Sequence, residues 1–196
     1  MTGVQTCALP ILNSGEIGLK YENPTTAYNN VGSINLDTIY WISRGNILGG
    51  GSGVSFYKVG NSKRYSRVAG SVLGNTEVKV NGGLIHCNVY GGSVLGSVGM
   101  YTDYDNDSTV CAQNTGRTQI TINGGAIGVD KDVCGTYGVG ADTTFNYGGH
   151  VYGAGRGFAT DAPILKKYCA VDTTSVIIKG GNVYGEVYGG GEQGRV

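Results

Sequence analysis

A short unit built around paired glycines recurs five times along the chain. Its first half reads T-x-(V/I)-x-(V/I)-x-G-G, and its second half is an apolar stretch that ends in V-Y-G-G-G or a close variant. The copies lie near residues 38–53, 76–96, 118–128, 143–157 and 174–194. A unit repeated along one chain is typical of stacked repeat architectures, in which each unit buries its apolar face against its neighbours.

Within a copy, apolar and polar residues alternate. Val78 and Val80 share one face of the segment, whereas Glu77, Lys79 and Asn81 share the other. Alternation of β-branched with polar residues predicts a half-buried strand. The glycine pairs that follow predict sharp corners, because glycine alone adopts positive φ and allows close backbone approach without steric cost.

These features predict an all-β fold, a right-handed parallel β-solenoid of four to five irregular coils with few or no helices. One coil takes about 24 residues, and longer loops are inserted at residues 54–69, 100–114, 128–142 and 158–172. The predicted core is a stack of valine and isoleucine side chains: Ile42, Val78, Val80, Val89, Ile120, Ile122, Val151, Val176, Ile178 and Val183.

Composition excludes several other classes. The 37 glycines do not fall at every third position, and only three prolines are present, which excludes collagen. Lysine and arginine total 14, as do aspartate and glutamate, so no basic surface for nucleic acid is expected. With 40% hydrophobic residues and no net charge, the chain is not a typical disordered segment. No apolar stretch approaches the ~20 residues that a membrane span needs.

The V-Y-G-G-G unit resembles the glycine-rich repeats of large adhesin-like surface proteins of gut-associated bacteria. This resemblance covers roughly residues 38–194, nearly all of the chain outside the adapter-like segment. It implies a non-enzymatic structural or adhesive segment of a secreted or cell-surface bacterial protein. Its expected partners are a host glycan or surface protein and the neighbouring repeats of the longer chain.

Residues 1–11, MTGVQTCALPI, resemble the in-frame translation of a common short-read sequencing adapter at every position. The alternative, a signal-peptide remnant, fits poorly because the segment has no basic region and its apolar run contains Pro10. We therefore treat residues 1–11 as an artefact and residues 12–196 as a fragment of a β-solenoid repeat domain from a metagenomic reading frame, truncated at both ends.

Four tyrosines that follow a valine in the repeat form the candidate ligand site: Tyr90, Tyr152, Tyr184 and Tyr188. If valine fills the core, the adjacent tyrosine points outward, and stacked coils place the rings in a column. Leu48 takes this place in the first copy, so the column is aromatic only from the second copy onward. Two readings stay open: the rings stabilise adjacent coils, or they form a glycan- or protein-binding strip.

A second candidate site is the alternating triplet Asp103, Asp105 and Asp107, which predicts at most weak Ca²⁺ binding; no other cofactor is expected. The remainder of a calcium loop is missing, and a solvated acidic loop explains the triplet equally well. A calcium-binding module is therefore one alternative function. A carbohydrate-active β-helix enzyme, a polysaccharide lyase or hydrolase, is another, although no repeated strand carries a carboxylate pair of acid/base type.

The remaining chemistry-bearing residues give little functional signal. The cysteines outside the adapter-like segment are Cys87, Cys111, Cys134 and Cys169, whose spacings fit no common zinc pattern. Free thiols and a Cys111–Cys134 disulfide both stay open. His86 and His150 are too few for a metal cluster, and His150 takes the repeat position of Asn46 and Asn182, which predicts an outward residue.

Overall fold

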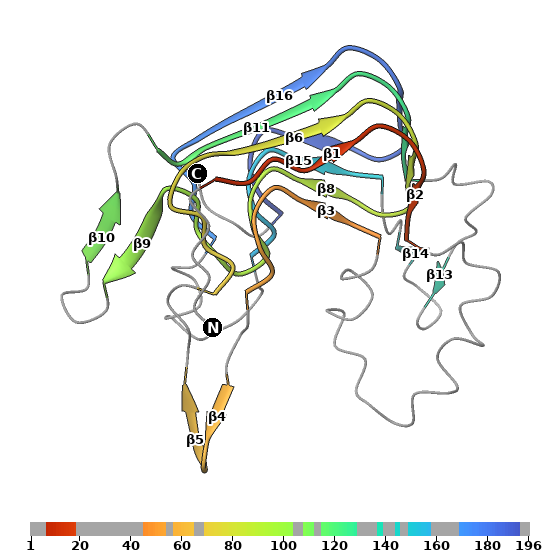
Figure 1. The fold of residues 1–196 in the computed structure, drawn as a ribbon. Coiled ribbons are helices and arrows are strands. Elements are labelled where there is room, and N and C mark those ends of the chain that lie inside the picture. Colours follow the sequence, from red (N-terminus) through yellow and green to blue (C-terminus); the bar gives the residue numbers. More distant parts are fainter. Residues whose placement is uncertain are drawn as a thin grey trace.

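The computed structural model describes residues 7–18, 45–53, 57–64, 69–103, 108–111, 115–128, 137–138, 144–145, 149–157 and 169–192. Every regular element within these ranges is a β-strand, and none is a helix (Figure 1). Most of the strands belong to three parallel sheets of four strands each. This arrangement is compatible with the predicted parallel β-solenoid.

Each parallel sheet takes one strand from each of four successive layers of chain. The first sheet holds β1 (Ile11–Leu12), β6 (Thr76–Val80), β11 (Arg117–Ile122) and β16 (Thr173–Ile178). The second sheet holds β2 (Glu16–Ile17), β7 (Leu84–Ile85), β12 (Ala126–Ile127) and β17 (Asn182–Val183). The third sheet holds β3 (Ile47–Leu48), β8 (Val89–Tyr90), β15 (Val151–Tyr152) and β18 (Val187–Tyr188). We number the layers 1 to 4 in this order, so that layer 1 contains β1, β2 and β3.

Register between layers follows the repeat. Thr118 pairs with Thr76 on one side and with Thr174 on the other, and Ile120 pairs with Val78 and Val176 in the same way. The second and third sheets keep equivalent positions side by side in the same manner. Equivalent residues of successive copies therefore stack directly on one another, as the alternation in the sequence predicts.

Two of the predicted copies contribute to a single layer. Residues 118–128 supply β11 and β12 of layer 3, and residues 149–157 of the copy near 143–157 supply its third strand, β15. The start of that copy forms β14 (Thr144–Phe145), which pairs antiparallel with β13 (Tyr137–Gly138) instead of joining the first sheet. The physical reason is that one strand on each of three sides completes a layer, so layer 3 has no place for a further strand.

The adapter-like segment takes part in layer 1. Ala8 forms a parallel bridge to Thr76, and Ile11 and Leu12 pair with Lys79 and Val80 of β6. Setting residues 1–11 aside from the fold was therefore wrong for residues 8–11. Whatever their origin, they supply apolar, strand-compatible side chains next to the edge of β6.

Described parts of the inserted segments form antiparallel strand pairs beside the layers. β4 (Tyr57–Val59) pairs with β5 (Ser62–Arg64), and β9 (Met100–Asp103) pairs with β10 (Ser108–Cys111). These two pairs and β13 lie within the predicted insertions, whereas β14 belongs to the start of the copy near 143–157.

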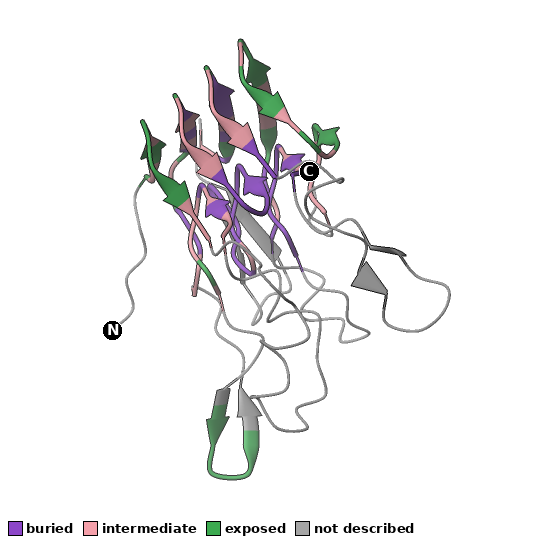
Figure 2. Ribbon diagram, turned by 90° about the vertical axis from the view of Figure 1, so that its right-hand side faces the viewer, coloured by how far each residue is buried: buried purple, intermediate pink, exposed green. Residues whose placement is uncertain are grey.

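Valine and isoleucine side chains of the three sheets meet in one core, whose buried members are Ile47, Val78, Val80, Ile85, Val89, Ile120, Ile122, Ile127 and Val151. Complete burial of each such side chain contributes roughly 1.5–3 kcal/mol. The predicted core residues of layers 2 and 3 are confirmed. In layer 4, Val176 and Val183 are only partly buried and Ile178 is exposed, because no described residue covers that layer (Figure 2). Predicted core residue Ile42 lies outside the described residues.

Buried threonines connect the first sheet to the third. The Thr76 hydroxyl donates to the Gly91 carbonyl oxygen at 2.5 Å, and the Thr118 hydroxyl donates to the Gly153 carbonyl oxygen at 2.5 Å. Each bond joins the beginning and the end of one layer. The threonine that begins the repeat therefore closes the layer through this hydrogen bond.

Candidate functional site

Three tyrosine rings form a stacked column on the third sheet. The ring centroids of Tyr90 and Tyr152 lie 5.0 Å apart with planes 7° from parallel, and those of Tyr152 and Tyr188 lie 5.0 Å apart with planes at 8°. Leu48 of layer 1 pairs with Tyr90 of layer 2. The predicted column, aromatic from the second copy onward, is confirmed for Tyr90, Tyr152 and Tyr188.

Tyr184 does not belong to this tyrosine column. It follows β17, whose Asn182 and Val183 pair with Ala126 and Ile127 in the second sheet. The V-Y dipeptide occurs twice in layer 4, and only the second occurrence, Val187-Tyr188, pairs with Val151-Tyr152. The prediction that Tyr184 joins the column is therefore wrong, because identical dipeptides fall on different sides of the layer.

Burial differs sharply along the column. Tyr90 is completely buried, at 0% exposure, Tyr152 is half-buried, and Tyr188 is 40% exposed. The prediction of an outward strip of accessible rings is therefore wrong at Tyr90. Since both faces of the Tyr152 ring contact other tyrosines, the open aromatic surface of the column is confined to its Tyr188 end.

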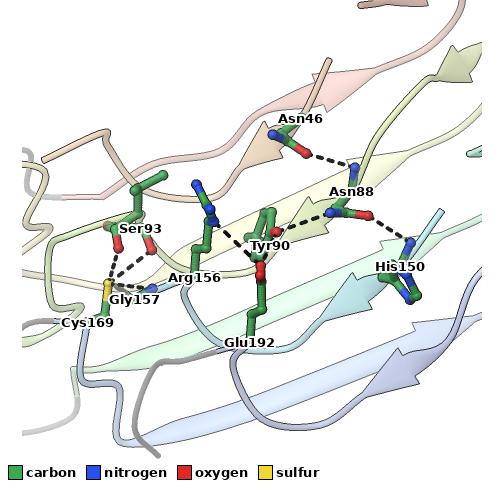
Figure 3. A network of polar contacts seen from close by, with 10 residues as sticks. Asn46, Asn88, Tyr90, Ser93, His150, Arg156, Gly157, Cys169 and Glu192 are labelled. Carbon is green, nitrogen blue, oxygen red and sulfur yellow. Dashed lines mark hydrogen bonds and ion pairs between the residues drawn. The ribbon is translucent and has the colours of Figure 1, made fainter. Parts of the chain in front are cut away.

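Carboxylates accept hydrogen bonds from the phenols at both ends of the column. The Tyr90 hydroxyl donates to Glu192 at 2.5 Å and accepts a hydrogen bond from the Asn88 side-chain amide at 3.1 Å (Figure 3). The buried Arg156 guanidinium places its Nε 3.6 Å from the same Glu192 carboxylate. The Tyr188 hydroxyl donates to Glu186.

These surroundings hold the phenols in their neutral form. Burial, followed by the nearby Glu192 charge, raises the pKa of Tyr90 far above its ordinary value. Burial and the same carboxylate raise the pKa of Tyr152 to about 12. The hydrogen bond to Glu186 raises the pKa of Tyr188. A phenol that stays protonated is a hydrogen-bond donor and a poor nucleophile or base.

A second column, of hydrogen-bonded side chains, runs beside the tyrosines, where the His150 ring centroid lies 5.9 Å from that of Tyr152 and 6.4 Å from that of Tyr188. Asn46 Oδ1 accepts from the Asn88 backbone N–H at 2.8 Å, and Asn88 Oδ1 accepts from the His150 N–H at 3.0 Å (Figure 3). His150 Nδ1 then accepts from the Glu186 N–H at 3.0 Å. We call these four residues the corner ladder.

In the corner ladder, His150 acts as an asparagine substitute, because its unprotonated Nδ1 takes the role that Oδ1 plays in Asn46 and Asn88. The predicted equivalence with Asn46 is confirmed. The equivalence with Asn182 is wrong, because Asn182 lies in the second sheet. The other histidine, His86, is buried and bonds to the Glu16 carboxylate.

A third column, which the sequence did not lead us to predict, lies at the end of the first sheet. The Asn81 amide donates to Asn13 Oδ1 at 2.8 Å, and the Asn123 amide donates to Asn81 Oδ1 at 2.7 Å. The signal was present as the recurrent N-G-G. Glu192 and Arg156 were also missed, and they carry no such signal, because Glu192 lies far from Tyr90 in sequence.

The predicted calcium triplet falls largely outside the described residues. Asp103 ends β9, and Asp105 and Asp107 are not among the described positions. Within the part of the chain that the structure describes, no three His, Cys, Asp or Glu side chains gather to hold a metal ion. Calcium binding stays a prediction.

The described cysteines outside residues 1–11 include two buried thiols, Cys87 and Cys169. Cys169 has a positive φ of 64°, and its Sγ contacts the carbonyls of Ser93 and Val94 and accepts from the Gly157 N–H at 3.3 Å. Burial raises the pKa of the Cys169 thiol to about 11. The predicted Cys111–Cys134 disulfide cannot be placed, because Cys134 lies outside the described residues.

Comparison of the chain with protein families, with curated proteins and with solved structures finds no match in any of the three. Among the described residues, no helix is long and apolar enough to cross a membrane.

Proposed function

We propose that the chain is a non-enzymatic structural segment of a secreted or cell-surface bacterial protein, folded as a right-handed parallel β-solenoid. Three parallel sheets with one strand per layer, in repeat register, support this architecture. A right-handed path is the usual one for crossovers between parallel strands. The localisation rests on the resemblance of the V-Y-G-G-G unit to adhesin-like repeats.

The tyrosine column is the observation that favours a structural role over glycan binding. A sugar-binding aromatic platform needs an open ring face, whereas both faces of Tyr152 are covered by neighbouring tyrosines. Tyr90 is fully buried, and its hydroxyl is already bonded to Glu192 and Asn88. In this proposal the column holds successive layers in register.

A carbohydrate-active enzyme is the weaker reading. The two carboxylates nearest the column, Glu186 and Glu192, both accept hydrogen bonds from phenols. Glu192 also lies beside the buried Arg156 guanidinium. Both carboxylates are therefore engaged in contacts within the protein, whereas glycosidic cleavage needs a pair of carboxyl groups that flank the substrate.

The test compares Tyr152→Ala and Tyr152→Phe with the parent in urea unfolding and on a glycan array. A structural column predicts that Tyr152→Ala, which removes a half-buried stacked ring, loses about 2 kcal/mol of folding free energy. Tyr152→Phe, which keeps the stacked ring, retains most of it.

The glycan array separates the adhesive reading. Tyr188 carries the open end of the column, so it is the ring that a glycan could contact. If the column is structural, the Tyr188→Ala variant and the parent give the same signal on the array. Parental binding to a glycan or mucin that Tyr188→Ala abolishes, with folding unchanged, would instead assign the column an adhesive role.

A further inference from the structure

Glycines at one corner of the third sheet face the layer above them. A side-chain Cβ at Gly49 would lie 2.0 Å from the Gly91 carbonyl oxygen, and one at Gly91 would lie 2.1 Å from the Gly153 carbonyl oxygen. A Cβ at Gly153 would lie 2.3 Å from the Gly189 carbonyl oxygen. Each of these glycines is therefore required by the backbone of the next layer.

Gly189 occupies the same position in layer 4, yet no atom of the described residues lies within 4 Å of a Cβ built there. The adjacent Gly190 is equally open. Neither glycine has a positive φ among those recorded for the described residues, so backbone conformation does not require glycine at either position. The steric reason that fixes glycine in layers 1 to 3 is absent at layer 4 within the described part of the chain.

The rest of the layer 4 surface matches this pattern. In layer 3, the N–H groups of Val151 and Gly153 donate at 2.9 Å to carbonyls of layer 4. β18 is the end strand of this sheet, and the equivalent N–H groups of Val187 and Gly189 have no backbone acceptor among the described residues. Ile178 is 45% exposed, whereas its layer 3 equivalent Ile122 is 1% exposed. We call this surface, formed by β16, β17 and β18, the layer 4 face.

The opposite end of the stack is different. Gly82, Gly124 and Gly180 face the layer below, where a Cβ would lie 2.7, 2.9 and 2.8 Å from the carbonyl oxygens of Asn13, Asn81 and Asn123. Layer 1 has Ser14 at this position. If a second copy stacked its layer 1 on the layer 4 face, the Ser14 Cβ would meet the Lys179 carbonyl oxygen.

We propose that the layer 4 face binds a further three-sided β-layer of the same repeat pattern, with its strands parallel and in register. The occupant carries glycine where Ser14 stands in layer 1, so it is a repeat unit of the layer 2 to 4 kind and not a second copy stacked head to tail. The inference rests on the proposed solenoid architecture. It assigns a polarity to the stack, with one end suited to accept a layer and the other obstructed.

The test extends the full chain by one unit of its own sequence. A second copy of residues 158–192 is placed after Gln193, which corresponds to Gly157 in the preceding layer. The matched control has the same added length, but serine replaces the added unit's equivalents of Val176, Ile178 and Val183. The proposal predicts a higher urea midpoint for the extended chain than for both the control and the parent.

Alanine at Gly189 provides the specific readout. Gly189→Ala leaves the midpoint of the parent chain unchanged, because the Cβ has open space, but it abolishes the gain in the extended chain. Gly153→Ala lowers the midpoint in both chains. If Gly153→Ala is harmless, the layered architecture itself fails.

Two results would overturn the docking proposal alone. One is an extended chain no more stable than its control while Gly153→Ala is damaging. The other is a parent chain that self-associates in sedimentation and loses that association with Gly189→Ala, which would make a second copy the occupant.

Discussion

The closure of each layer by a buried threonine gives a sharply testable prediction. Thr118 is fully buried, and its hydroxyl donates to the Gly153 carbonyl oxygen at 2.5 Å, with the Thr173 carbonyl oxygen farther away at 3.4 Å. Thr118→Val keeps the shape and the strand preference of the side chain and removes only the donor. The perturbation therefore isolates the hydrogen bond.

Its magnitude follows from two opposing effects. A buried acceptor left without its donor costs about 1–3 kcal/mol. Replacing the hydroxyl with a methyl group adds apolar burial of about 0.8 kcal/mol. We therefore expect Thr118→Val to lower the free energy of unfolding by about 0.2–2 kcal/mol, which is measured by urea unfolding followed by circular dichroism.

Thr121 is the matched control on the same strand. It is also buried, and its hydroxyl has no hydrogen-bond partner among the described residues. Thr121→Val should leave stability unchanged or raise it by less than about 1 kcal/mol. If the two variants unfold at the same urea concentration, the closing hydrogen bond contributes nothing and the reasoning is refuted.

Three further predictions concern neighbouring features. Ala8→Thr places a hydroxyl where layers 2 and 3 have their closing threonine, so it should raise stability by about 0.5–1.5 kcal/mol in urea unfolding; no gain would mean that layer 1 is not closed in the same way. His150→Asn should keep the corner ladder and the parental midpoint, whereas His150→Leu should lower it, since only asparagine accepts from Glu186 N–H; equal midpoints would contradict the ladder. Because burial raises the pKa of Tyr152 from 10.0 to about 12, the Tyr152 phenol loses its proton at a lower pH in the unfolded chain than in the folded protein. The free energy of unfolding should therefore be highest below pH 10 and fall as the pH rises toward 12. This decrease should be less steep in the Tyr152→Phe variant.

Sequence reasoning succeeded where one local pattern determines both strand and register. In β6 and β11, alternate valine and isoleucine must face the core, and a shift of one residue would turn all of them to solvent. The column of Tyr90, Tyr152 and Tyr188 follows from the same rule. The parts that pair in neighbouring layers were therefore predictable without the structure.

The failures come from features that local patterns do not encode. Val183-Tyr184 and Val187-Tyr188 have the same dipeptide, and only their distance from the preceding corner places them on different sheets. The contact between Glu192 and Tyr90 connects layer 4 with layer 2 and passes layer 3. No periodicity in the sequence indicates such a contact.

The prediction that residues 1–11 take no part in the fold was wrong at residues 8–11 for another reason. Their resemblance to an adapter concerns origin, whereas a strand position requires only apolar, extended residues beside an open edge. Ala8 and Ile11 meet that requirement against β6.

The most direct test of the layered, in-register arrangement is disulfide trapping between β6 and β11. Glu77 and Gln119 are paired neighbours, so their Cα atoms lie about 4.8 Å apart, within the range of about 4.4–6.8 Å that a disulfide requires. In a Cys7→Ser background, the Glu77→Cys/Gln119→Cys variant is oxidised and its linked peptides are identified by mass spectrometry. The matched Glu77→Cys/Thr121→Cys variant places the two Cα atoms about 8 Å apart. Efficient linkage of the first pair alone is the predicted result, and linkage of the second pair alone, or of neither, would contradict the register on which the three sheets depend.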